Sequence, residues 1–281
     1  MATAGKHIGL IAGSGPFPII FAEKAAEKGY AVYAVGYNKE TDPDLAHHVA
    51  AMETMAIGQL GRLIRFFKKH GVEAAVMVGA IRKPGSLSEA KPDFKAIRLL
   101  AGMRKNTHDD QVLRAFARAL ENEGIRVRSS TFLLPELLAA KGCWTRIKPD
   151  HAALADIELG WQMAKAIGNL DIGQCVVVGN GTVLAVEAVD GTDSTIARGA
   201  RLGNGNAVVV KVCKPIQDFR FDVPAVGAGT IRTMHEAGAR VLVIEAEKSV
   251  VFEKEEMIEL ADRFGIAIVA LEDGVSVGEQ V

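Results

Sequence analysis

The stretch Ile8-Gly9-Leu10-Ile11-Ala12-Gly13-Ser14-Gly15-Pro16 decides the fold class of this chain. Its apolar run is typical of a buried strand, and it leads directly into a glycine turn. The next residues, Phe17–Lys28, have a helical pattern that stops at Gly29, and Ala31–Val35 is expected to be the second strand. Strand, glycine turn, helix and strand in this order predict a βαβ unit with parallel strands.

The same alternation continues through the first half of the chain. Helix and strand patterns follow one another at Leu60–His70, Ala74–Val78, Asp109–Glu123 and Ile125–Val127. The regularity is then lost, because prolines and glycines interrupt the sequence between Pro135 and Pro149. We therefore predict an N-terminal Rossmann-like parallel α/β domain at residues 1–135 and a linker at residues 136–149.

The second half is expected to form a mixed α/β domain at residues 150–281. After a helix at Asp150–Ile167, two apolar segments flank Gly179-Asn180-Gly181, a sequence that is typical of a tight hairpin turn. Further strands are expected at Ala207–Val212, Val241–Glu245 and Ala267–Ala270, with a helix at Lys254–Gly265. The C-terminal domain therefore combines an antiparallel hairpin with strand–helix alternation.

Composition and charge exclude several classes of function. The 281 residues include 33 Lys and Arg against 34 Asp and Glu, a formal charge of −1, so the chain lacks the basic footprint of a nucleic-acid binder. No apolar run approaches the roughly 18 residues of a membrane span. The cysteines, Cys143, Cys175 and Cys213, form no CxxC pair, which predicts buried thiols in a reducing compartment. We therefore expect a cytoplasmic protein that does not bind nucleic acid.

The loop Gly13-Ser14-Gly15 is the first candidate for ligand binding. A glycine turn before a helix N-terminus can direct backbone N–H groups at a phosphate. A tight turn without any ligand is the alternative. The spacing is G-x-G-x-x-P, and no acidic residue follows the second strand near Val35-Gly36-Tyr37, so the loop is a poor match to a dinucleotide fingerprint.

The densest polar cluster runs from Lys211 to Asp222. It holds three cations, two carboxylates and an amide: Lys211, Lys214, Arg220, Asp218, Asp222 and Gln217. Arg220 and Asp222 alternate with phenylalanines, and this period of two predicts an extended segment with its charges on one face. Carboxylates bind hard cations such as Mg²⁺ and basic side chains bind phosphate oxygens, so the cluster suits phosphoanhydride chemistry. A solvated, salt-bridged strand end is the alternative.

A second polar cluster joins Glu187, at the end of a predicted strand, to Gly191-Thr192-Asp193, at the start of a predicted helix. This arrangement places a hydroxyl and a carboxylate at a helix N-terminus. Such groups either contact a ligand or cap the helix.

Taken in order, these motifs resemble those of the UDP-2,3-diacylglucosamine pyrophosphatase family of the lipid A pathway. The similarity is to the two-domain type that occurs where the metallophosphoesterase-type enzyme is absent, and it spans nearly the whole chain. It is carried by Ile8–Gly15, Asp109-Asp110, Asp171-Ile172-Gly173-Gln174, Ala185-Val186-Glu187, Gly191-Thr192-Asp193 and Lys214-Pro215-x-Gln217-Asp218-x-Arg220-x-Asp222-x-Pro224-x-x-Gly227.

The resemblance implies Mg²⁺-dependent hydrolysis of the diphosphate of UDP-2,3-diacylglucosamine, with Mn²⁺ as the alternative metal. The products are UMP and 2,3-diacylglucosamine 1-phosphate (lipid X). It implies that Asp222 and Asp218 are catalytic carboxylates and metal ligands in a catalytic C-terminal domain. Lys214 and Arg220 are then expected to stabilise charge on the phosphate oxygens.

The resemblance also implies substrate-binding residues and partners. The expected contacts come from Gly13, Ser14, Gly15, Gln174, Glu187, Thr192, Asp193, Lys211 and Gln217. Members of this family tend to dimerise, so a homodimer is expected. The amphipathic substrate adds the expectation of peripheral contact with the inner membrane.

Two other functions fit parts of the pattern. A Rossmann-type nucleotide-sugar oxidoreductase or transferase would use the first βαβ unit, but it needs a ribose-binding acid after the second strand. A non-catalytic nucleotide-binding module would leave the carboxylates of Lys214–Asp222 without a role. Titration with NAD(H) tests the first alternative, and absence of UMP release with Mg²⁺ present favours the second.

Overall fold

The computed structural model describes residues 6–81, 91–101, 109–215, 218–221 and 223–273, which divide into two compact units. The first unit contains the described residues up to Pro135 together with residues 218–221. The second unit contains residues 136–215 and 223–273. A short segment from the second half of the sequence therefore belongs structurally with the first half.

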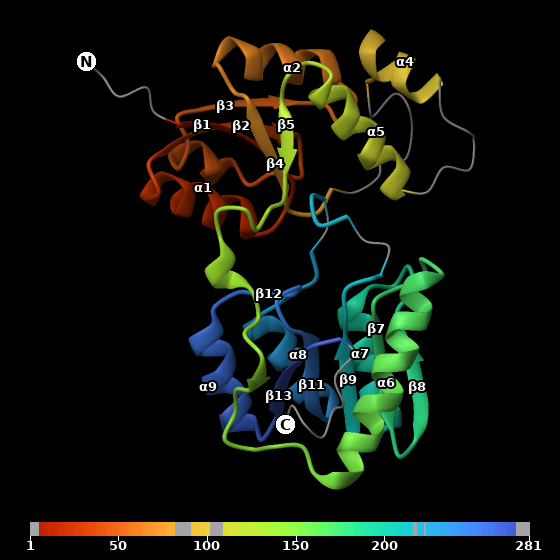
Figure 1. Cartoon of the computed structure of the whole chain (residues 1–281). Helices are drawn as coiled ribbons and strands as arrows, with labels where there is room; N and C mark the ends of the chain where they lie inside the picture. The colour runs from red at the N-terminus through yellow and green to blue at the C-terminus, as the bar shows by residue number, and fades with distance from the viewer. Residues whose placement is uncertain (1–5, 82–90, 102–108, 216–217, 222, 274–281) are drawn as a thin grey trace. The chain divides into compact units, whose positions relative to one another are not determined.

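The first unit is built on a five-stranded parallel sheet in the order β3-β2-β1-β4-β5 (Figure 1). Its strands are β1 (Lys6–Ala12), β2 (Tyr30–Tyr37), β3 (Ala51–Met55), β4 (Ala74–Val78) and β5 (Arg126–Arg128). Its helices are α1 (Phe17–Glu27), α2 (Leu60–Lys69), α4 (Phe94–Ala101) and α5 (Asp109–Glu121), with a 3-10 helix η1 (Pro43–His47). The predicted parallel α/β class is confirmed.

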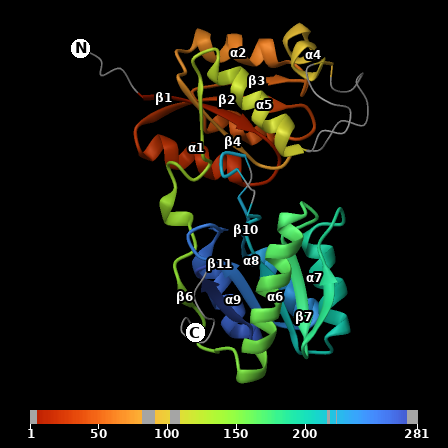
Figure 2. The same cartoon turned by 45° about the vertical axis from the view of Figure 1, so that its right-hand side comes forward.

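The helices of this unit cover opposite faces of the sheet. Leu63 of α2, Ala96 of α4 and Leu120 of α5 share one buried core with the strands. Phe21 of α1 is also buried but lies outside that core, and Figure 2 shows α1 and α2 on opposite sides of the sheet. Strand β3 was not predicted, because this edge strand is mostly half-buried and has no continuous apolar run.

The second unit is built on a six-stranded mixed sheet in the order β6-β13-β11-β9-β7-β8. Its strands are β6 (Gly142–Cys143), β7 (Cys175–Gly179), β8 (Thr182–Val186), β9 (Ala207–Lys211), β11 (Ala239–Glu245) and β13 (Ala267–Leu271). Strands β9, β11 and β13 are parallel, whereas β7 is antiparallel to β8 and β9. The predicted hairpin is present, with positive φ angles of 51° at Asn180 and 72° at Gly181.

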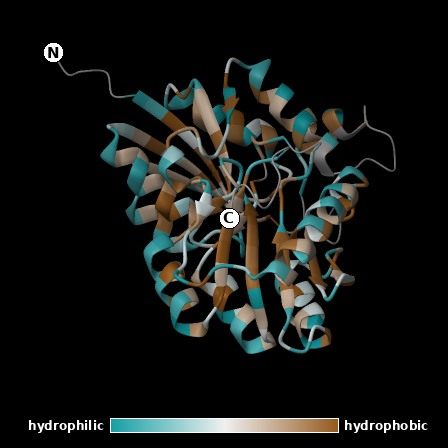
Figure 3. Cartoon of the chain, turned by 60° about the horizontal axis from the view of Figure 1, so that its bottom comes forward, coloured by the Kyte–Doolittle hydropathy of each residue, from teal (hydrophilic) through white to brown (hydrophobic). Residues whose placement is uncertain are grey.

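Helices cover both faces of the second sheet. They are α6 (His151–Asn169), α7 (Thr192–Leu202), α8 (Ala228–Ala237) and α9 (Lys254–Phe264), and the smaller elements are η2 (Pro135–Leu137), β10 (Ala225–Val226) and β12 (Val250–Val251). Because strand side chains alternate, Val176 packs with Ile157 of α6, while its neighbour Val177 packs with Ile196 of α7. Figure 3 shows these strands as predominantly hydrophobic between helices that are largely polar outside.

One local prediction is wrong. The segment Asp218–Phe221 was expected to be extended, but it forms a turn in which Phe221 N donates to Asp218 O at 3.0 Å. The cause is local, because Asp218 Oδ1 also accepts from Arg220 N at 3.1 Å, as Asp side chains do when they stabilise turns. The alternation of charged and aromatic residues therefore reflects turn chemistry rather than a strand.

Candidate functional site

The glycine loop lies at the carboxyl ends of β1 and β4, where the strand order of the first sheet reverses. Ligands of open parallel sheets bind at such a point. Gly13 N donates to Val78 O at 2.8 Å and Ser14 N donates to Ala80 O at 2.7 Å. A Cβ on Gly13 would collide with the Ala80 carbonyl oxygen, so glycine is needed for this close approach of two backbones. Two N–H groups of the predicted phosphate loop are thus bonded within the protein.

The segment Asp218–Phe221 is bonded to helix α5 of the first unit. Arg220 Nε and Nη2 donate to the Asp218 carboxylate at 3.0 and 2.8 Å, and Arg220 Nη1 donates to Glu121 Oε1 at 3.0 Å. Phe221 packs against the core that α2 and α5 share. Arg220 is therefore held between two carboxylates from different parts of the sequence.

The carboxylate of Asp218, a predicted metal ligand, is bound by Arg220 in this arrangement. Its two carboxylate oxygens accept four hydrogen bonds from Arg220, which leaves no oxygen without a donor. The hydrogen bond from the Arg220 side chain lowers the pKa of Asp218 and raises that of Arg220, so both groups are charged. Within the described ranges, no group of three or more His, Cys, Asp or Glu side chains could hold a metal ion.

The structure brings together three predicted substrate contacts at one edge of the second sheet. Glu187 follows β8 and is 7% exposed, and its Oε1 accepts from Thr192 Oγ1 at 2.7 Å. Its Oε2 accepts from Gln174 N at 3.0 Å. Gln174 Oε1 is buried and accepts no hydrogen bond from any described residue. A buried acceptor without a donor is uncommon in folded proteins, and it marks this cluster as a place where a ligand could donate.

Lys211 and Asp193 lie around the same edge. Lys211 is the register partner of Cys175, and its Nζ donates to Ala225 O at 2.8 Å. Burial raises the pKa of the Cys175 thiol to about 12, and the charges of Lys211, Glu187 and Asp193 all act on it. Thr192 and Asp193 occupy the first turn of α7, whose preceding residue, Gly191, makes no side-chain cap. Thr192 therefore orients Glu187 rather than capping its own helix.

Lys214 lies beyond β9 and is paired with an acid. Its Nζ donates to Asp171 Oδ1 at 2.8 Å. Asp171 belongs to the Asp171-Ile172-Gly173-Gln174 motif, so the pair links two of the motifs that carried the family resemblance. Two other predicted site residues, Asp222 and Gln217, lie outside the described residues, and the Asp109 and Asp110 side chains do as well.

A buried ion cluster that the sequence did not predict lies at the carboxyl end of β11. Glu245 is fully buried, and each of its oxygens accepts from Lys165 Nζ at 2.8 Å. Lys248 Nζ donates to it at 2.7 Å and Cys213 N at 2.9 Å. The available signal was an acid that directly follows the apolar run Val241–Ile244, because polar groups at the ends of parallel strands meet at one edge of a sheet.

Two family models match this chain. The LpxI N-terminal domain matches residues 7–137, and the LpxI C-terminal domain matches residues 140–269. A relative named UDP-2,3-diacylglucosamine pyrophosphatase LpxI, from Caulobacter vibrioides, is 31% identical over 279 residues, which are 95% of this chain and 98% of the relative.

Two solved structures of other proteins are weakly similar to this chain. The biotin carboxylase domain of Hydrogenobacter thermophilus 2-oxoglutarate carboxylase is 14% identical, with a TM-score of 0.27 over 64% of this chain and 36% of that one. N5-carboxyaminoimidazole ribonucleotide synthetase from Thermotoga maritima is 13% identical, with a TM-score of 0.26 over 66% and 42%. The chain spans less than half of either protein, and likenesses this weak support no inference about ligands.

The family matches agree with the ordered motifs of the sequence, from the glycine opening to the Lys214–Gly227 segment. They extend over both structural units, and the relative matches almost from end to end. This chain belongs to the LpxI family.

Proposed function

We propose that this protein hydrolyses the diphosphate of UDP-2,3-diacylglucosamine in lipid A biosynthesis. Water adds to one phosphorus, the bond from that phosphorus to the bridging oxygen breaks, and UMP and 2,3-diacylglucosamine 1-phosphate are released. The observation that carries the proposal is the relative from Caulobacter vibrioides, which is named for this activity and matches 95% of the chain. The buried Gln174–Glu187–Thr192 cluster supports it, because Gln174 Oε1 is an acceptor to which no described residue donates.

Specific residues of this chain are assigned to the substrate. Gln174, Glu187 and Thr192 are proposed to bind its polar groups, with Lys211 and Lys214 supplying positive charge for the phosphate oxygens. Arg220 has five N–H donors, and its side-chain hydrogen bonds to Asp218 and Glu121 use one N–H on each of its three nitrogens, the one on Nε being shared by both Asp218 oxygens; among the described residues, two N–H groups are thus left for a phosphate. Asp218 is therefore proposed to position Arg220 rather than to bind metal.

Dependence on a divalent metal is part of the proposal. When bound, Mg²⁺ would polarise a phosphoryl oxygen and lower the pKa of a coordinated water. Asp222 is the carboxylate that we assign to it, on the sequence motif alone. A homodimer, a cytoplasmic location and peripheral contact with the inner membrane also stay predictions. Within the described ranges, no helix combines the length and apolar character required to cross a bilayer.

Release of UMP from UDP-2,3-diacylglucosamine tests the proposal directly. We expect turnover that EDTA abolishes and that added Mg²⁺ or Mn²⁺ restores. Asp222→Ala is expected to fold, to bind substrate and to lose about 100-fold or more in rate, which corresponds to roughly 2.7 kcal/mol of transition-state stabilisation. Glu236→Gln, an exposed acid on α8, is the matched control and should retain full activity.

The results separate the parts of the proposal. An inert wild-type protein with Mg²⁺ present would contradict hydrolysis and favour a nucleotide-binding module. Full activity in EDTA would show that the reaction needs no divalent metal. Full activity of Asp222→Ala would show that Asp222 takes no part in the reaction.

A further inference from the structure

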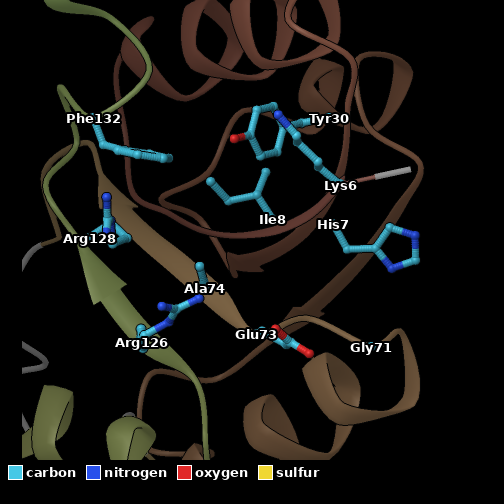
Figure 4. Close-up of a pocket in the computed structure, with 10 residues that line it drawn as sticks. All are labelled: Lys6, His7, Ile8, Tyr30, Gly71, Glu73, Ala74, Arg126, Arg128 and Phe132. Atoms are coloured by element: carbon cyan, nitrogen blue, oxygen red, sulfur yellow. The ribbon is translucent and has the colours of Figure 1, made fainter. Parts of the chain in front are cut away.

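An open cavity of about 650 Å³ lies at the amino ends of β1, β2, β4 and β5 in the first unit (Figure 4). Its volume is within the range of small-molecule sites, roughly 300–1,000 Å³. The glycine loop occupies the opposite, carboxyl edge of the same sheet. None of the predicted site residues lines this cavity.

The cavity exists because one face of the sheet is only partly covered by helix. Val127 of β5 is buried in the core shared with α2 and α5, so the flanking Arg126 and Arg128 point to the opposite face, where α1 lies. There the segment after β5, anchored by a hydrogen bond from Lys28 Nζ to Leu133 O, takes the place of a second helix. Because this segment is not a helix, it covers less of the sheet face than a helix would, and the cavity remains beside it.

The charges lining the cavity are unbalanced. Three cations, Lys6, Arg126 and Arg128, line it, and Glu73 is the single acid in the lining. His7 is a further polar residue of the lining. Among the described residues, the side chains of these three cations make no hydrogen bond or ion pair with a carboxylate. Other cationic side chains of this unit are paired with carboxylates, as Arg62 is with Glu53 and Arg220 with Asp218. Uncompensated cations around one hollow attract an anion.

The walls of the cavity are aromatic and its floor is apolar. Figure 4 shows the Phe132 and Tyr30 rings on either side of Ile8. The Arg128 guanidinium carbon lies 4.3 Å from the Phe132 ring centroid, and Lys6 Nζ lies 5.5 Å from that of Tyr30. These contacts hold the two cations beside the rings without using their charge in an ion pair. A ligand that enters the cavity therefore meets flat apolar surfaces and positive charge together.

We propose that this cavity binds a phosphomonoester attached to a flat ring, of which a nucleoside monophosphate is the fitting class. The phosphate lies at Arg126, Arg128 and Lys6, and arginine can bind it through two N–H groups. The base lies against Tyr30 and Phe132. The inference concerns a second site, and it does not depend on the hydrolytic activity of the protein.

Calorimetric titration of the full-length protein with UMP, uridine and inorganic phosphate tests the proposal. UMP is expected to bind more tightly than uridine or phosphate alone, because only UMP offers both groups. Arg126→Ser/Arg128→Ser should weaken UMP binding at this site by about 10-fold or more, in line with the loss of charge-assisted hydrogen bonds. Arg201→Ser/Arg240→Ser removes the same charge from exposed positions of the second unit and should leave binding unchanged.

Hydrogen exchange locates the bound UMP, because the catalytic site is also expected to bind this product. Protection of residues 126–132 by UMP, lost in Arg126→Ser/Arg128→Ser, supports the proposal. No protection there, equal UMP affinity in this variant, or equal weakening in the control pair overturns it. UMP release should be unaffected in Arg126→Ser/Arg128→Ser, so failure of the cavity proposal and failure of the hydrolase proposal give different results.

Discussion

At the scale of single residues, the burial of a charged side chain decides how much stability is lost when its partner is removed. Glu245 has no exposed surface, and its oxygens accept from two lysines and one backbone N–H. Glu256 on α9, by contrast, is exposed, and Arg232 at 2.6 Å is its ion-pair partner. Breaking a buried ion pair leaves a desolvated charge without its partner, whereas an exposed pair is already screened by water.

Glu245→Ala should therefore lower the free energy of unfolding by about 3–5 kcal/mol, because the largely buried Lys165 loses its buried partner and is left with the exposed Asp273 at 3.3 Å. Glu256→Gln should change it by less than about 1 kcal/mol. Urea denaturation followed by the fluorescence of Trp144 and Trp161, both in the second unit, measures the two effects. Equal stability of the two variants would contradict the assignment of Glu245 as a structural anchor.

The Asp218–Arg220 pair gives a pH dependence with a definite sign. The hydrogen bond from Arg220 lowers the pKa of Asp218 below its ordinary value of 3.8. Its contribution to the folded state is thus complete above the ordinary pKa and is lost as the pH falls through the lowered one. In an NMR titration, the Asp218 carboxyl carbon should titrate below pH 3.8, and the chemical shift of Arg220 Nε–H should change over the same range. Titration of the Asp218 carboxyl carbon at or above pH 3.8 would show that the pair does not form in solution.

At the scale of elements, close packing between helix and sheet outweighs intrinsic helix propensity. Gly160 in the interior of α6 faces β9, and a Cβ built there would lie 2.6 Å from Val210 Cγ2. Gly229 in α8 has open space around the same position. Alanine favours a helix by about 1 kcal/mol over glycine, but overpacking a core costs about 1–3 kcal/mol.

Gly160→Ala should consequently destabilise the second unit by about 1 kcal/mol, while Gly229→Ala should be neutral or stabilising. Thermal and urea unfolding of the two variants against wild type give the comparison. A stabilised Gly160→Ala protein would mean that α6 and β9 move apart at little cost.

At the scale of the whole molecule, the two structural units do not follow the order of the sequence. Phe221 lies late in the sequence, yet it packs against the core of the first unit, and Arg220 bonds to α5. The motif richest in charge thus spans residues that belong to both units. The stability of the first unit is therefore expected to depend on Phe221, a residue from the second half of the sequence.

Phe221→Ala should speed hydrogen exchange in the α5 peptide, residues 109–121, because about 1–3 kcal/mol of apolar contact is removed there. Exchange in β7, residues 175–179, should stay unchanged. Phe219→Ala is the control, since Phe219 is 38% exposed and does not belong to that core. Equal effects on α5 and β7 would indicate general destabilisation instead.

The sequence by itself determined the local features of this protein. The run Ile8–Ala12 with its glycine turn predicted the first βαβ unit, and Asn180-Gly181 predicted the hairpin, because apolar periodicity and turn chemistry act over a few residues. The ordered motifs also indicated the family. Only the tertiary structure decided that Asp218 is fully engaged by Arg220, that Glu245 anchors a buried ion cluster, and that Arg126 and Arg128 share a cavity with Phe132 and Tyr30. These features depend on residues far apart in the sequence, and no local pattern encodes which charges become neighbours when strands from different segments align.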